Sequence, residues 1–295
     1  MTRLQANLLL LLAGAMWGMG FVAQSTAMAA IGPFLFIGLR FLIATISMLP
    51  FALREAGMAK MPLSRRDWRA FGLVGLLLFG GMAAQQVGLL TTSVTNSGFL
   101  TGLYVVMVPF FAVIIFRQWP SPVVWPATVL ALAGIWLLSG GDMVALKPGD
   151  WLTILCAAFW ALQVIFIARH AADTGRPVTL AVAQFAVCAV VGLAAALAFE
   201  PIAFEMIRGA LAELLYAGIF SGGIAFTLQV VGQRYTTAPQ AAIFLSTEAV
   251  FAALFGAIFL GERVPPAGLV GCGLIFAAIL LVEVLPAIRE QRPTT

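Results

Sequence analysis

The amino-acid sequence predicts an all-α membrane protein with ten transmembrane helices, and three observations support this class. Hydrophobic residues make up 62% of the 295 residues and charged residues only 9%, whereas about 25% of the residues of an ordinary soluble domain are charged. Apolar stretches of about 20 residues, the length that a helix needs to cross a hydrocarbon core, recur along the whole chain. Lys and Arg gather in every second connection between these stretches. The composition excludes a soluble enzyme and a soluble nucleic-acid-binding protein.

The apolar stretches define ten spans joined by short connections, which leave no room for a separate soluble domain. The first stretch follows Met-Thr-Arg, as in a signal peptide, but Trp17 interrupts it and a matching segment recurs later, so we expect a retained first helix. The predicted spans lie at 6–24, 34–53, 70–90, 94–115, 123–140, 151–169, 178–199, 210–230, 240–260 and 267–285.

The positive residues predict the orientation of these spans. If the connections alternate between the two sides of the membrane, 12 Lys and Arg residues lie on the side of the N-terminus and three lie on the other side, while Arg40 falls within a span. Because positive residues concentrate on the cytoplasmic side, both termini are expected in the cytoplasm. We therefore expect a multi-pass protein of a bacterial inner membrane. The three residues on the far side are Lys147, Arg208 and Arg263.

The seven tryptophans fall into two groups. Five lie close to span ends, where an indole ring contacts lipid and its N–H reaches the headgroups. Trp17 and Trp160 lie nine or ten residues beyond the expected membrane entry of their helices, which is a depth of about 14 Å. These two are therefore expected near the midplane. The five interfacial residues are Trp68, Trp119, Trp125, Trp136 and Trp151.

The chain divides into two related halves, 1–146 and 147–295. Trp17 precedes Pro33 by 16 residues and Trp160 precedes Pro177 by 17, and seven residues after each proline come Arg40-Phe41 and Gln184-Phe185. Further along, Phe99-Leu100-Thr101 is echoed by Phe244-Leu245-Ser246. Each half contains five spans, an odd number, so the second half enters the membrane from the opposite side. Such inverted repeats form central cavities that open alternately to the two sides.

With these motifs, the sequence resembles the drug/metabolite transporter superfamily, specifically its bacterial ten-helix exporters with two EamA-type repeats. The resemblance covers nearly the whole chain. It rests on Trp17-Gly18, on Arg40-Phe41, on Phe99-Leu100-Thr101, and above all on the run from Phe244 to Glu262. Such exporters often have a proline, and with it a helix kink, where this chain has Ala249. Because this chain lacks that proline, its sequence does not predict the kink.

The resemblance implies a secondary transporter that exports small metabolites. The branch that the sequence resembles most exports aromatic amino acids and related compounds, while other branches of the superfamily handle sugars, nucleotide-sugars and cations. The substrate therefore does not follow from the resemblance.

Arg40 is the most informative single residue, because a charge about 10 Å inside a span is costly unless it faces protein, water or a ligand. Its guanidinium can donate two parallel hydrogen bonds to a substrate carboxylate. Alternatively, it is a structural residue that caps helix carbonyls or extends to the membrane surface. Its counterpart in the second half, Gln184, is uncharged, so the site is expected to be asymmetric.

The other candidates describe a cavity with aromatic walls and neutral polar groups. Trp17 and Trp160 are the expected walls, although packing is an equally good explanation for either one. A cavity of this kind suits amphipathic small molecules better than phosphates, which require several Arg or Lys residues. The neutral candidates are Gln24, Gln85, Asn96, Tyr104, Gln163 and Gln184.

Glu248 lies about eight residues into the ninth span, where a carboxylic acid is expected to be protonated, paired or facing water. We consider it a candidate for proton coupling, with a hydrogen-bonded structural role as the alternative.

The sequence offers little for other chemistry. Because the chain lacks a glycine-rich phosphate loop ending in Lys-Ser or Lys-Thr, we expect no nucleotide hydrolysis and no nucleotide-hydrolysing subunit. Three widely spaced cysteines without nearby His or acidic residues predict neither a metal site nor disulfides, and no cofactor is expected. The expected partners are a small-molecule substrate and the lipid bilayer, and not nucleic acid. The sequence thus predicts a non-enzymatic exporter of amphipathic metabolites such as amino acids or organic cations, with a channel, a sensor or a sugar transporter as alternatives.

Overall fold

The computed structural model describes residues 1–59, 61–92, 94–138, 146–261, 263 and 266–290, with the side chains of 94–96, 138 and 283–290 left aside. Its regular structure is helical throughout the described residues, which confirms the all-α prediction. The helices of the first half are α1 (Arg3–Ala27), α2 (Pro33–Met58), α3 (Arg65–Gly88), α4 (Val94–Gly102), α5 (Tyr104–Phe116) and α6 (Val124–Leu138). Those of the second half are α7 (Pro148–Thr174), α8 (Pro177–Phe199), α9 (Phe204–Gly209), α10 (Leu211–Leu215), a π-helix (Tyr216–Ile224), α11 (Ala225–Gln233), α12 (Ala238–Leu245), α13 (Thr247–Leu260) and α14 (Pro266–Glu290).

Each predicted span coincides with a helix or with consecutive helices. Among the described residues, eight such segments are long and apolar enough to cross a membrane, and the apolar parts of α6 and α14 are shorter. Bulky apolar side chains such as Ile114, Val190 and Leu197 lie exposed on the outside of the bundle, as expected for side chains that contact lipid. The chain is therefore a multi-pass membrane protein.

Three spans expected as continuous helices, 94–115, 210–230 and 240–260, are interrupted. The fourth predicted span breaks at Leu103 and the ninth at Ser246, whereas the eighth passes through the π-helix. At the ninth, the Ser246 and Thr247 hydroxyls donate to the carbonyl oxygens of Ile243 and Phe244, at 2.7 and 2.8 Å. Such bonds compete with the helical backbone pattern and favour a break. The break thus lies just before Glu248, and not at Ala249.

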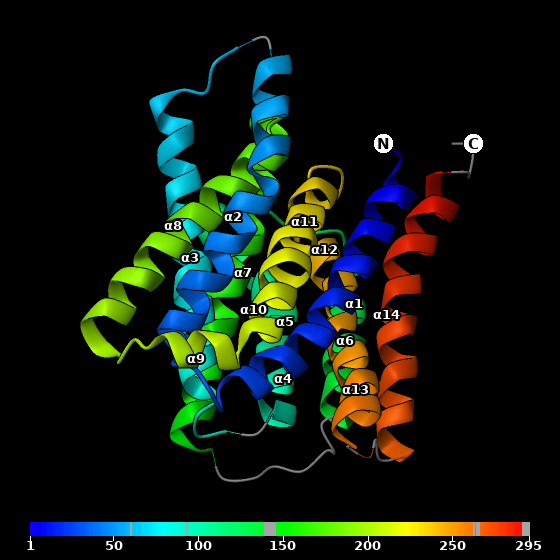
Figure 1. Cartoon of the computed structure of the whole chain (residues 1–295). Coiled ribbons are helices and arrows are strands. Elements are labelled where there is room, and N and C mark those ends of the chain that lie inside the picture. The colour runs from blue at the N-terminus through cyan, green and yellow to red at the C-terminus, as the bar shows by residue number, and fades with distance from the viewer. Residues whose placement is uncertain (60, 93, 139–145, 262, 264–265, 291–295) are drawn as a thin grey trace.

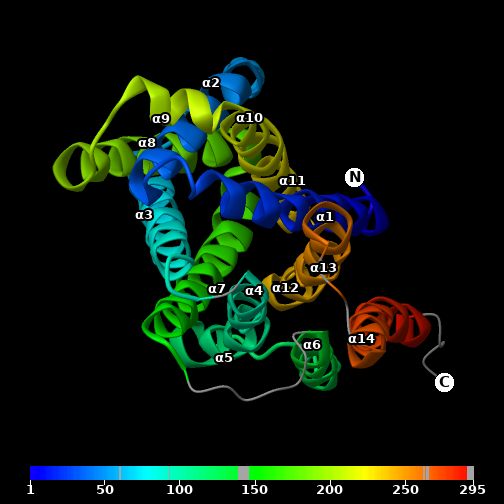
Figure 2. The same ribbon diagram turned by 60° about the horizontal axis from the view of Figure 1, so that its bottom comes forward.

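The two halves pack so that their contacts correspond in pairs. Among the described residues, two of the three largest interfaces join α2 to α8 and α6 to α14, which are helices at the same position in the two halves. The contact of α3 with α7 has its counterpart in the contact of the π-helix and α11 with α1. In the same way, the contact of α13 with α1 corresponds to the contact of α4 and α5 with α7. Figure 2 shows α6 and α14 together at one edge of the bundle, with α2 and α8 on the far side.

Hydrogen bonds from backbone N–H groups to a carboxylate join α2 and α8 at both ends of their contact. The Glu200 carboxylate accepts hydrogen bonds from the backbone N–H groups of Phe34 and Leu35, both at 2.8 Å. The Glu55 carboxylate accepts from the backbone N–H groups of Val178 and Thr179, at 3.1 and 2.7 Å. Each helix thus places a carboxylate at the N-terminus of the other, where free N–H groups and the helix dipole favour a negative charge.

Close backbone contact in the middle of this pair depends on two glycines. A Cβ atom added at Gly38 would lie 2.7 Å from the backbone nitrogen of Leu193, and one at Gly192 would lie 2.9 Å from the backbone nitrogen of Gly38. Small residues at such crossings let membrane helices pack backbone to backbone. Together with the two carboxylates, they fix α2, and with it Arg40, against the second half.

The connections at each end of the bundle agree with the charge pattern of the sequence. The start of α1 and the end of α14 lie at the same end (Figure 1). There, Arg176 donates to the carbonyl oxygen of Met61 at 2.7 Å, and Arg3 donates to Gln240 at 2.8 Å. Connections that the sequence assigns to the positively charged side are therefore neighbours in space.

Candidate functional site

A central cavity lies where both halves meet. Its volume open to water-sized molecules is about 40 Å³, and the empty space among its lining atoms, open solvent included, is about 460 Å³. Six of its lining residues were predicted from the sequence to contact substrate, and a seventh, Glu248, was predicted for coupling. The cavity is lined by Trp17, Phe21, Gln24, Arg40, Met82, Gln85, Thr101, Tyr104, Trp160, Val164, Ser221, Phe226, Gln229, Leu245 and Glu248.

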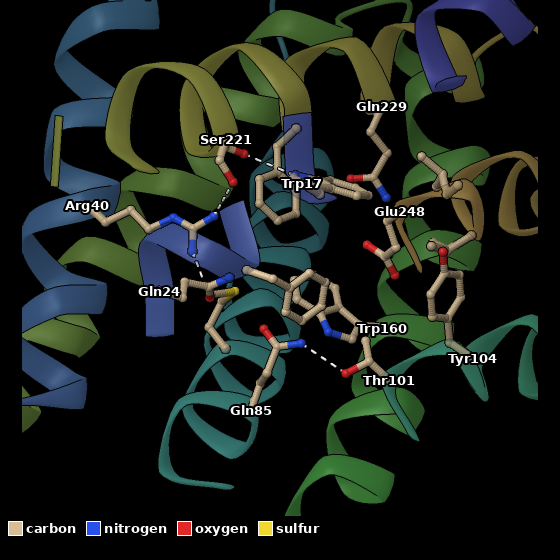
Figure 3. A pocket seen from close by; sticks show the side chains of 15 residues that line it. Trp17, Gln24, Arg40, Gln85, Thr101, Tyr104, Trp160, Ser221, Gln229 and Glu248 are labelled. Atoms are coloured by element: carbon tan, nitrogen blue, oxygen red, sulfur yellow. Dashed lines mark hydrogen bonds between the residues drawn. The ribbon is translucent and has the colours of Figure 1, made fainter. Parts of the chain in front are cut away.

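Arg40 lies at one side of the cavity, held by three neutral acceptors (Figure 3). Its Nε donates to the carbonyl oxygen of Ala217 at 3.1 Å, its Nη1 to Gln24 Oε1 at 3.1 Å and its Nη2 to Ser221 Oγ at 2.9 Å. The side chain is only 2% exposed, and within the described part of the chain no carboxylate lies within ion-pair distance of it. A buried cation without a counter-ion is costly, so this position favours an anionic ligand group.

The π-helix explains how Arg40 and Trp17 come together. Both side chains reach Ser221: Arg40 bonds its hydroxyl, and Trp17 Nε1 donates to its carbonyl oxygen at 3.0 Å. A π-helix carries an irregular backbone and is frequent at functional sites. Ser221 therefore links the first half to the second at the cavity wall. No sequence feature identified this residue, because a serine beside Gly222 and Gly223 is typical of a helix-packing position.

Trp17 and Trp160 are the two aromatic walls, and Phe226 lies against both. The ring centroids of Trp17 and Phe226 are 4.7 Å apart, and those of Trp160 and Phe226 are 5.6 Å apart with nearly parallel planes. The cluster unites α1, α7 and α11 from both halves. An apolar ligand surface therefore separates the Arg40 side of the cavity from the opposite side (Figure 3).

Glu248 and Tyr104 occupy that opposite side (Figure 3). Glu248 is the second residue of α13, directly after the break at Ser246, and the Tyr104 hydroxyl lies beside its carboxyl group. Helix α13 lies tightly on α1, because a Cβ atom at Gly18 would be 2.7 Å from the backbone nitrogen of Ala252. This contact fixes Glu248 relative to Trp17.

Gln85, predicted from its position in the third span, also lines the cavity, where its Nε2 donates to Thr101 Oγ1 at 3.0 Å. Thr101 belongs to the repeated Phe-Leu-Thr motif, which served above as evidence for the repeats and for the family resemblance and not as a site prediction.

Two predicted residues are not in the cavity lining. Gln163 and Gln184 are fully buried behind the wall, where Gln163 Nε2 donates to Gln184 Oε1 at 3.1 Å. Gln229 Nε2 in turn donates to Gln163 Oε1 at 3.2 Å. The expectation that these amides lie on the cavity face was wrong in position, because Gln163 bonds to Gln184 and Gln229 between α7, α8 and α11. The side chain of Asn96 lies outside the described residues.

Residues that the sequence interpretation missed complete the cavity. Phe21, Met82, Val164, Phe226 and Leu245 are apolar residues in apolar helices, so no sequence feature distinguishes them from core or lipid-facing positions. Gln229, in contrast, is a polar residue within the eighth span, and its cost in a membrane was a usable signal.

A second, wider space lies at the end of the bundle where the chain begins. Its volume open to water-sized molecules is about 740 Å³, it lies between α5, α6, α7, α12 and α14, and its lining includes Arg3, Trp119, Arg169 and Asp173. It has charged residues of both signs and lacks the aromatic cluster of the central cavity.

Comparison with known proteins places this architecture in a family. The sequence pattern of the EamA-like transporter family matches residues 4–140 and again residues 147–284. An uncharacterized transporter of Archaeoglobus fulgidus is 31% identical over 281 residues, which cover 95% of this chain and 86% of that protein. The uncharacterized transporter YwfM of Bacillus subtilis is 27% identical over 97% of this chain and 95% of its own.

One relative with a named function matches part of this chain, and one solved structure matches its fold over nearly the whole length. The threonine/homoserine exporter RhtA of Escherichia coli is 30% identical over 168 residues, which are 54% of this chain and 53% of that protein. A crystal structure with 19% identity aligns with a TM-score of 0.80 over 99% of this chain and 100% of its own, and so shows a shared fold. With two matches that together span nearly all of its length, the chain belongs to the EamA-like transporter family.

Proposed function

We propose that this secondary transporter exports amino acids with an apolar or aromatic side chain, bound in the central cavity. The observation that carries the proposal is Arg40, a buried guanidinium at the edge of an aromatic cluster, for which the described residues supply neutral acceptors and no counter-ion. A substrate carboxylate supplies the missing charge, and the fork of an arginine matches its geometry. The partial similarity to a threonine/homoserine exporter supports the same class of substrate.

The proposed mechanism is alternating access between two halves of opposite orientation, 1–146 and 147–295. The paired contacts of the halves support it, since two arrangements of similar elements can exchange roles. In this view all ten spans cross a bacterial inner membrane, and both termini lie in the cytoplasm. Glu248 stays the candidate for proton coupling, because it is an acid that lines the cavity and lies two residues after the helix break at Ser246.

The orientation is testable by labelling single cysteines. In a variant without native cysteines, Gly57→Cys and Ala172→Cys should react with a membrane-impermeant maleimide only from the cytoplasmic side. Leu146→Cys and Glu205→Cys should react only from the outside, because the positive residues hold the first pair of connections in the cytoplasm. Labelling of all four from one side would contradict the ten-span arrangement.

The function is tested by flux into proteoliposomes. Radiolabelled L-phenylalanine, L-leucine and L-threonine should enter by a saturable route, and glucose and tetraphenylphosphonium should not, since neither carries a carboxylate for Arg40. Saturable glucose flux with no amino-acid flux would favour a sugar transporter. Ionic conductance without saturable flux would favour a channel.

A further inference from the structure

We propose that the Glu248 side of the cavity binds the ammonium group of the substrate, so that the cavity recognises a zwitterion through two separate charged ends. The inference rests on the proposed transport of amino acids and assigns a role to the side of the cavity opposite Arg40.

Three oxygen-bearing side chains come together on this side from three different helices. Glu248 comes from α13, Tyr104 from α5 and Gln229 from α11. All three residues are at most 7% exposed. An ammonium group has three N–H donors, and a carboxylate, a phenol oxygen and an amide oxygen are the acceptors that would satisfy them.

The orientation of Gln229 is fixed by its neighbour. Its Nε2 donates to Gln163 Oε1 at 3.2 Å, and its Oε1 has no hydrogen-bond partner within the described part of the chain. The Tyr104 hydroxyl lies beside the Glu248 carboxyl group, so its O–H can donate there while its oxygen keeps a lone pair as an acceptor. Buried polar atoms without partners are uncommon and costly in a folded protein. At a cavity wall they indicate a ligand that supplies the missing donors.

The two sides of the cavity have opposite character. On one side Arg40 presents hydrogen-bond donors, of which three of the five N–H groups are engaged by Ala217, Gln24 and Ser221. On the other side stands a carboxylic acid among acceptors, and Trp17 and Trp160 lie between the two (Figure 3). A ligand with only one charge leaves the opposite side unsatisfied, whereas a zwitterion satisfies both.

The test compares three probes that differ only in their charged groups. L-phenylalanine has both groups, 3-phenylpropanoate lacks the ammonium, and phenethylamine lacks the carboxylate. Binding is measured by isothermal titration calorimetry on the full-length protein in lipid nanodiscs. Wild-type protein should bind L-phenylalanine at least tenfold more tightly than either single-charge probe.

The variants separate the ammonium contact from general damage. Glu248→Gln should weaken L-phenylalanine binding at least tenfold and leave 3-phenylpropanoate binding within twofold of wild type, which also reports correct folding. Tyr104→Phe should weaken L-phenylalanine binding less than Glu248→Gln does, and it should also leave 3-phenylpropanoate binding unchanged. Glu205→Gln is the matched control, because Glu205 is an exposed glutamate remote from the cavity, and it should change neither.

Two results overturn the inference while amino-acid transport stands. One is an equal loss of binding affinity for L-phenylalanine and for 3-phenylpropanoate in both Glu248→Gln and Tyr104→Phe. The other is that wild-type protein transports L-phenylalanine but binds 3-phenylpropanoate as tightly as it binds L-phenylalanine. If wild-type protein neither binds nor transports L-phenylalanine, leucine or threonine, the proposed function itself fails, and this inference with it.

Discussion

Replacing Arg40 by lysine should reduce the transport of carboxylate substrates about 100-fold. Lysine keeps the positive charge but loses the fork that donates two parallel hydrogen bonds, and it cannot reach Ala217, Gln24 and Ser221 together. Two lost charge-assisted hydrogen bonds cost roughly 3 kcal/mol, which corresponds to about two powers of ten in an equilibrium constant. Initial rates of L-phenylalanine uptake into proteoliposomes measure the effect.

A comparison of substrates separates binding from structure at Arg40. Phenethylamine has no carboxylate and should enter slowly even with wild-type protein, and this slow uptake should fall much less in Arg40→Lys than the uptake of L-phenylalanine does. Equal losses for both probes would indicate a structural arginine that only joins α2 to α1 and the π-helix. Arg208→Lys is the control, since the Arg208 side chain is 72% exposed, and it should transport both probes as wild type does.

Removing either central tryptophan should reduce transport about 5- to 100-fold while the protein still reaches the membrane. Trp17→Ala and Trp160→Ala each remove an apolar wall, which weakens substrate contact by roughly 1–3 kcal/mol. Trp17→Ala should have the larger effect, because it also breaks the hydrogen bond to the Ser221 carbonyl and the contact with Phe226. Uptake per reconstituted molecule is the measurement.

A tryptophan on the same helix as Trp160 provides the control. Trp151, also on α7, is 61% exposed, so Trp151→Ala removes an identical side chain without touching the cavity. It should retain wild-type uptake. Normal uptake in both Trp17→Ala and Trp160→Ala would argue against an aromatic substrate cavity.

The helices were predictable from the sequence because length and hydropathy alone define a membrane span. Their interruptions were not, because the break at Ser246 depends on two hydroxyls that bond backbone carbonyls within one helix turn. The π-helix at Tyr216–Ile224 has no simple pattern of residue types either. Hydrophobic periodicity predicts that a segment is helical but not where its backbone departs from regular helix geometry. Such departures change the direction of the side chains that follow them.

The candidate site was predictable where a residue is costly in a membrane. Arg40 and Glu248 were identified on this basis, and the structure places both at one cavity together with Gln24 and Gln85, which were predicted as its neutral polar groups. Gln163 and Gln184 were misplaced, because two buried amides can bond to each other without facing a cavity. Phe226 escaped notice for the opposite reason: an apolar residue costs nothing in a membrane, so only three-dimensional packing reveals that it joins the two tryptophans.

The most direct test of the account is a structure of the protein with L-phenylalanine bound, determined in lipid nanodiscs. The account predicts the carboxylate within hydrogen-bond distance of Arg40, the ammonium beside Glu248 and Tyr104, and the ring against Trp17 and Trp160. L-phenylalanine bound instead in the wider space between α5, α6, α7, α12 and α14, with the central cavity empty, would contradict it.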